Sequence, residues 1–76
     1  MPRLGELVQL GHNSLKNAGV DDPKLTSALL LAEALGKDRV YLLAHDRDEV
    51  DPEVYRRFLL FIERRSQGEP LQYITG

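Results

Sequence analysis

The sequence has no cysteine, so no disulfide can reinforce its fold. It also lacks an apolar run of membrane-spanning length, and its first residues lack the basic start and apolar stretch of a secretory signal. An excess of positive charge is absent too: ten basic and twelve acidic residues give a net charge of −2, which removes the simplest argument for nucleic-acid binding. These absences predict a soluble, cytoplasmic protein without membrane contact.

The 76 residues suffice for one domain. A core of this size rarely contributes more than roughly 3–5 kcal/mol when no disulfide or metal supports it. We therefore expect one compact unit of modest stability, and we expect a monomer.

The first half of the chain contains two segments with the spacing of apolar residues that is typical of helices. In residues 4–18, one side is apolar and includes Gly11, where a missing side chain lets another helix approach closely. The second segment, residues 25–35, begins after the capping signal Asp22-Pro23 and ends at Gly36. Because apolar residues cover almost its whole circumference, we place the second helix at the centre of a bundle.

The second half predicts a short helix and a long one. Asp38 can cap residues 40–44, and Asp51-Pro52 repeats the capping signal at the start of a helix that runs to about Gln67, with Gly68 as its stop. The apolar arc of this last helix consists of Val54, Tyr55, Phe58, Leu59, Phe61 and Ile62. Residues 69–76 show no helical period, so we expect them to be extended. The predicted fold is all-α: a small orthogonal bundle of four to five helices with an extended C-terminal linker segment.

Residues 64–76, which read RRSQGEPLQYITG, closely resemble the interdomain segment of the HemK/PrmC family. The leucine-rich residues 29–36 are similar to the family's second helix, and Tyr41-Leu42 matches the short helix after it. One departure is Thr26-Ser27, where the family often has Asp-Ala. The resemblance covers nearly the whole chain but only the N-terminal part of the family's architecture.

Members of that family use S-adenosylmethionine to methylate a glutamine side chain, in the GGQ motif of peptide-chain release factors, which supports translation termination. The resemblance implies that residues 1–68 form a helical N-terminal, substrate-recognition domain. It also implies that residues 69–76 begin the linker to an absent C-terminal methyltransferase domain. The linker residues that it singles out are Gly68, Glu69, Pro70, Tyr73 and Gly76. The implied partners are a release factor and the protein's own methyltransferase domain.

The sequence lacks the family's catalytic motifs. No glycine-rich loop follows a strand, as in a cradle for a nucleotide-like cofactor, and the Asn-Pro-Pro-Tyr motif that holds the target amide in the family is absent. Methyl transfer requires close alignment of the two reacting groups, so a domain without these pockets can assist only by positioning a partner. We therefore expect no catalytic residue, cofactor or metal in this chain, and S-adenosylmethionine in the full-length enzyme.

Three residues of the last helix are candidates for contact with a partner: Arg56, Leu60 and Arg64. They recur every fourth residue on the side away from the main apolar arc, and arginines with an apolar anchor are favoured in protein contacts. Two other functions stay open. The chain could be a free-standing helical interaction module, or a small nucleic-acid-binding domain that uses these arginines.

Two further patterns favour no site. The acidic residues between positions 46 and 53 lack the glycine that a calcium loop needs at its sixth position, which Asp51 occupies. His12 and His45 have no cysteine or second histidine at metal-ligand spacing, so we interpret both as surface residues.

Overall fold

The computed structural model describes residues 2–76, and over this range it contains five helices and no strand. The helices are α1 (Leu4–Asn17), α2 (Pro23–Leu35), α3 (Arg39–Ala44), α4 (Pro52–Ser66) and α5 (Leu71–Thr75). The prediction of an all-α bundle of four to five helices is therefore confirmed. Among the described helices, none is long and apolar enough to cross a membrane.

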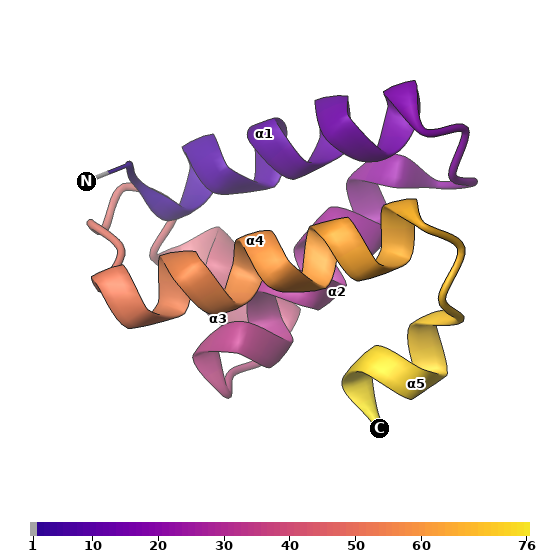
Figure 1. Ribbon diagram of the computed structural model, residues 1–76. Coiled ribbons are helices and arrows are strands. Elements are labelled where there is room, and N and C mark those ends of the chain that lie inside the picture. Colours follow the sequence, from indigo (N-terminus) through magenta and orange to yellow (C-terminus); the bar gives the residue numbers. More distant parts are fainter. Residues whose placement is uncertain (1) are drawn as a thin grey trace.

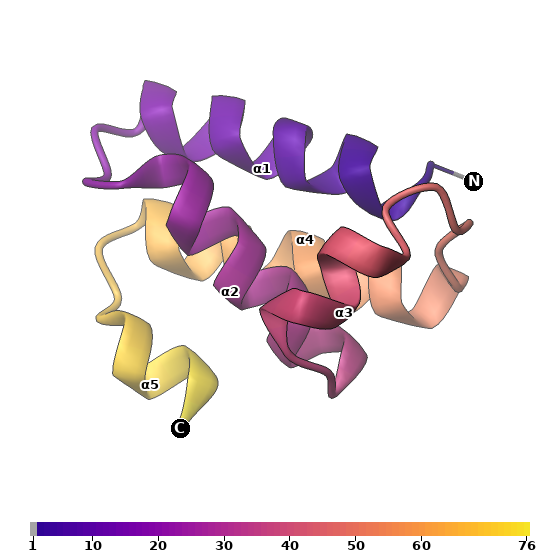
Figure 2. The ribbon, with the colours of Figure 1, turned by 180° about the vertical axis from the view of Figure 1, so that it is seen from behind.

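Helix α2 lies at the centre of the bundle, as its apolar circumference predicted. Helices α1 and α4 run side by side, and α2 crosses behind them in the view of Figure 1. The reverse view shows α3 and α5 well apart from each other, with α2 between them (Figure 2). Helix α2 contacts all four other helices, so its position determines how each of them packs.

The core lies between α1, α2 and α4. Its largest fully buried apolar side chains are Leu7, Leu15, Leu30, Leu31 and Phe58. The prediction that Leu59 belongs to the apolar arc of α4 is wrong, because this side chain is exposed. Helix α4 lies at the surface of the bundle, and its neighbours cover a narrower arc than the apolar residues span.

Gly11 allows α1 to approach α2 and α4 closely, as predicted. A Cβ atom at this position would lie 2.2 Å from Ser27 Oγ and 2.8 Å from Phe58 Cζ. Both separations are well below the optimal contact of about 3.5–4.0 Å between non-bonded carbon atoms. The Ser27 side chain is fully buried, and its hydroxyl donates a hydrogen bond to the Val8 carbonyl oxygen at 2.8 Å. At this point the contact between α1 and α2 is therefore tight, and the buried hydroxyl group is hydrogen-bonded.

Two of the three predicted aspartate caps are confirmed. Asp38 Oδ1 accepts a hydrogen bond from the Tyr41 amide at 2.9 Å, and Asp51 Oδ1 accepts one from the Glu53 amide at 2.8 Å. The prediction for Asp22 is wrong, because its side chain makes no capping hydrogen bond. A capping residue needs an extended backbone, whereas the tight turn between α1 and α2 holds Asp22 in the left-handed region, with φ at 48°.

Replacing Asp38 with alanine should destabilise the chain, because the first turn of α3 loses its side-chain acceptor. We expect a loss of about 1 kcal/mol in the free energy of unfolding, typical of a lost N-cap. Urea denaturation followed by circular dichroism measures it. Asp38→Asn is the matched control, since the amide oxygen can still accept the hydrogen bond. Equal losses in both variants would show that capping is not the cause.

The prediction that residues 69–76 are extended is wrong, because residues 71–75 form α5. Pro70 precedes the helix, and the Ile74 side chain is only 8 % exposed. Leu71 is partly buried against the same core. One helical turn is too short to show a period in the sequence, and the burial of two apolar side chains favours the helix here.

Candidate partner-binding surface

The acidic loop between α3 and α4 supports the start of α1. The amide of Leu4 donates to the Asp48 carbonyl oxygen at 3.0 Å, and the amide of Gly5 donates to the Asp46 carbonyl oxygen at 2.9 Å. These contacts satisfy two of the amides that the first turn of a helix leaves free. No cluster of three or more potential metal ligands occurs among residues 2–76.

The two histidines have different surroundings. The His45 ring stacks on Tyr41, with ring centroids 4.0 Å apart, and its Nδ1 lies 2.9 Å from Asp48 Oδ2. His12 is partly buried, and its Nδ1 has no hydrogen-bond partner within the described part of the chain. His45 therefore joins the end of α3 to the loop that follows it.

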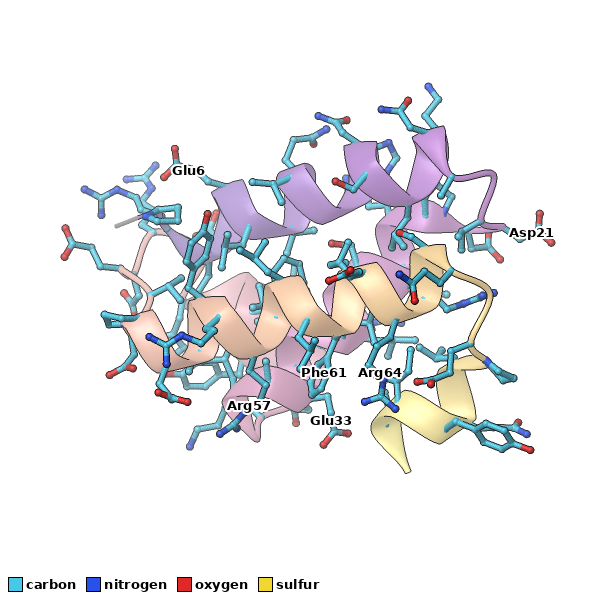
Figure 3. All side chains as sticks on the ribbon, in the orientation of Figure 1. Glu6, Asp21, Glu33, Arg57, Phe61 and Arg64 are labelled. Atoms are coloured by element: carbon cyan, nitrogen blue, oxygen red, sulfur yellow. The ribbon has the colours of Figure 1, made fainter. Side chains whose placement is uncertain are left out.

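The candidate residues Arg56, Leu60 and Arg64 all lie on α4, but they are not equally free. Leu60 is 54 % exposed. Arg56 is exposed and donates to Glu53 Oε2 at 3.2 Å, a pair within one turn of the helix. Arg64 instead reaches the segment after α4, where it pairs with Glu69, and Figure 3 shows it between α4 and α5. Only Arg56 and Leu60 are therefore open to solvent over most of their surface.

Arg57, the neighbour of this row, has a structural contact that the sequence did not reveal. Its Nη1 donates to the Ala34 carbonyl oxygen in the last turn of α2, at 3.2 Å. A cation at this position satisfies a free carbonyl group and interacts favourably with the helix dipole. No sequence signal could have found it, because the partners are 23 residues apart on different helices.

The predicted linker residues form a turn and then a helix. Gly68 has φ at 98°, in the region that favours glycine, and it separates α4 from Glu69 and Pro70. Tyr73 is 69 % exposed on α5, and Gly76 follows the helix. The Tyr73 ring therefore contributes nothing to the core of the bundle.

A hollow with exposed apolar side chains lies between α1, α2 and α3, and the sequence did not predict it. Its apolar lining residues are Val8, Leu25, Ala28, Val40, Leu42 and Leu43. Val40 is 71 % and Leu43 81 % exposed. Of the six residues of α3, only Leu42 is buried.

A comparison with protein families identifies the chain. The model described as "PrmC N-terminal domain" matches residues 6–76. The chain belongs to this family. The resemblance inferred from residues 64–76 is thereby confirmed, and so is its extension over nearly the whole chain.

The chain is also similar to part of several curated proteins named "Release factor glutamine methyltransferase". The protein of Moorella thermoacetica is 41 % identical over 73 residues, which are 96 % of this chain and 24 % of the relative. That of Aliivibrio fischeri is 39 % identical over 70 residues, 92 % of this chain and 25 % of the relative. That of Deinococcus radiodurans is 35 % identical over 74 residues, 97 % of this chain and 27 % of the relative. The chain thus spans about a quarter of the length of these relatives. No solved structure gives a significant match.

Proposed function

We propose that this chain is the N-terminal domain of an S-adenosylmethionine-dependent release factor glutamine methyltransferase, and that it binds the release factor and positions it for methylation. The match of residues 6–76 to the PrmC N-terminal domain carries the proposal. The names of the relatives support the substrate. We further propose that the protein acts in the cytoplasm as a monomer.

The described residues do not fit the cofactor of such an enzyme. A strand followed by a glycine-rich loop and a helix cradles nucleotide-like cofactors, and residues 2–76 contain no strand. We therefore assign methyl transfer to the remainder of the full-length protein. The contribution of this domain is binding: it holds the release factor near the catalytic domain and so raises its effective concentration there.

Residues 69–76 remain the proposed connection to the methyltransferase domain. They are folded onto the bundle, however, because Ile74 is buried and Leu71 is partly buried. A deletion that tests the domain should therefore include α5, so that no buried side chain is left without its packing partners.

Removal of residues 1–75 from the full-length enzyme should raise KM for an intact release factor. We expect an increase of about tenfold or more, which corresponds to about 1.4 kcal/mol of lost binding. A short peptide with the GGQ glutamine serves as the control substrate, and its kcat/KM should stay within about twofold, because it is too small to span both domains. An unchanged KM for the release factor would contradict the proposal.

Within the domain, we propose that Arg56 and Leu60 contact the release factor. Their joint replacement by alanine in the full-length enzyme should raise KM several-fold without lowering kcat, as expected for loss of one or two contacts of about 1 kcal/mol each. Steady-state methylation kinetics measures both constants. Arg64, the third member of the predicted row, is tested separately below because it also binds Glu69.

Leu43→Ala is the matched control for this experiment. Leu43 is more exposed than Leu60 but lies on α3, away from the row on α4. Its replacement should leave KM unchanged. A raised KM for Leu43→Ala together with a normal KM for the α4 variant would place the contact on α3 and reject the row.

A further inference from the structure

Two arginines at the end of α4 bind the chain segment that follows them. Arg64 forms an ion pair with the Glu69 carboxylate, and its Nη2 donates to the Tyr73 carbonyl oxygen at 3.3 Å. Arg65 Nη1 donates to the Glu69 carbonyl oxygen at 3.4 Å. The Glu69 amide in turn donates to the Arg64 carbonyl oxygen at 3.1 Å, which closes the turn at Gly68. The segment is therefore held at two places, before and within α5.

Helix α5 needs such support. A helix of five residues is not stable alone, because too few hydrogen bonds form for the backbone that must be ordered. Its packing is limited to contacts with α2 and α4, and only Ile74 is buried. The buried Ile74 and the partly buried Leu71 can hold this short helix against the bundle, but they leave its direction poorly defined. The Arg64 guanidinium group restricts that direction, because its Nη2 meets both the Glu69 carboxylate, as an ion pair, and the Tyr73 carbonyl oxygen, as a hydrogen bond.

We propose that Arg64 is a positioning residue of the methyltransferase. Together with Glu69 it holds α5 in one orientation on the bundle, and α5 sets the direction in which the chain continues towards the catalytic domain. This inference rests on the function proposed above. Its consequence is that the release factor bound by the helical domain is presented to the catalytic domain at a defined angle.

If the ion pair between Arg64 and Glu69 were only a surface contact, its loss would affect different measurements. The side chains of Arg64 and Glu69 are 36 % and 34 % exposed, and an ion pair of this kind often adds little to global stability. Measurements of global unfolding would therefore not distinguish a positioning role from a surface contact without effect. Two other measurements do distinguish them: the local opening of α5 and the kinetics of the full-length enzyme. A surface contact without effect would change neither.

Amide hydrogen exchange on the 76-residue chain tests the local part. The amides of Tyr73 and Gly76 are suitable probes, since they donate to the Pro70 and Gln72 carbonyl oxygens, and these bonds exist only when α5 is formed. In Arg64→Gln, both should exchange about 3- to 10-fold faster, as expected when a charged hydrogen-bond donor is lost from a partly exposed site. Amides of α1 and α2 should keep their rates, which shows that the bundle stays folded.

Three variants identify the interaction. In Arg64→Lys the positive charge is kept, but a shorter side chain with a single ammonium group replaces the guanidinium, so protection should be only partly restored. The exchange of partners, Arg64→Glu with Glu69→Arg, can restore the ion pair but not donation from position 64 to the Tyr73 carbonyl oxygen, and should also be intermediate. Arg56 lies on the same helix but pairs with Glu53, so in Arg56→Gln the amides of Tyr73 and Gly76 should exchange at the same rates as in the unsubstituted chain. Unchanged exchange at Tyr73 and Gly76 in Arg64→Gln would overturn the proposal.

The full-length enzyme tests the functional part. Arg64→Gln should raise KM for an intact release factor about 3- to 10-fold, in proportion to the opening of α5, and leave kcat/KM for a GGQ peptide unchanged. Equal losses with both substrates would overturn the positioning role. If the original full-length protein failed to methylate release factors, the proposed function would fall, whereas the exchange experiment would still decide whether Arg64 orders α5.

Discussion

Replacement of Phe58 with alanine should leave most of the chain unfolded at room temperature. Phe58 lies on α4 and its ring is fully buried, with its tip at the point where Gly11 of α1 meets Ser27 of α2. Truncation of a buried phenylalanine costs about 3–5 kcal/mol, from lost apolar burial and from the cavity that remains. A core of this size rarely contributes more than roughly 3–5 kcal/mol in total. The loss therefore matches or exceeds the stability that holds the domain together.

Circular dichroism at 222 nm and urea denaturation measure this effect. Leu60→Ala is the matched control, since it removes an apolar side chain of similar size from the same helix at an exposed position, and its effect should stay within about 0.5 kcal/mol. A Phe58→Ala chain with a native spectrum and a midpoint close to the original would show that the core does not depend on this ring.

Replacement of Gly11 with valine should be almost as damaging as loss of Phe58, and Gly11→Ala should cost about 1–3 kcal/mol, as expected for overpacking. Alanine normally stabilises a helix relative to glycine by about 1 kcal/mol, so the sign of this effect is diagnostic. A new Cβ would lie 2.2 Å from Ser27 Oγ and 3.0 Å from Ile62 Cδ1. Helix α1 must then move away from α2 and α4, which opens the core.

A double variant tests the cause. Ser27→Ala removes the oxygen closest to the new Cβ. The Val8 carbonyl group loses its hydrogen bond from Ser27, but it lies within α1. The double variant Gly11→Ala with Ser27→Ala should therefore lose less unfolding free energy than the two single variants lose together. We expect a difference of about 0.5–2 kcal/mol, as found for residues in direct contact. Urea denaturation of all four chains supplies the comparison. Strict additivity would show that the helices do not meet at this point.

The candidate surface was only partly predictable. The four-residue spacing of Arg56 and Leu60 was enough to place them on the exposed side of α4. The same spacing included Arg64, although its guanidinium group turns to Glu69 and Tyr73. A helical wheel describes where a side chain leaves its helix, but a long arginine side chain ends several ångströms away, where the neighbouring segment determines its partner. The exposure of Val40 and Leu43, which lie outside this surface, was not predicted for a related reason: in a helix of six residues, the pattern does not indicate which apolar side is covered.

The sequence alone specified the local features of the fold. Proline after aspartate began α2 and α4, Gly36 and Gly68 followed the ends of helices, and the apolar circumference of α2 placed it at the centre. Such signals act through backbone conformation and capping within a few residues, so they do not depend on the rest of the structure.

Contacts between distant segments required the folded chain. The left-handed Asp22, the helical state of residues 71–75 and the bond from Arg57 to Ala34 each depend on what lies beside them in space. For α5 the reason is energetic: one turn of helix is unstable in water and forms here because the bundle buries Ile74, while Arg64 reaches the Tyr73 carbonyl oxygen. The sequence contains the side chains that make this contact, but only the folded chain brings them together.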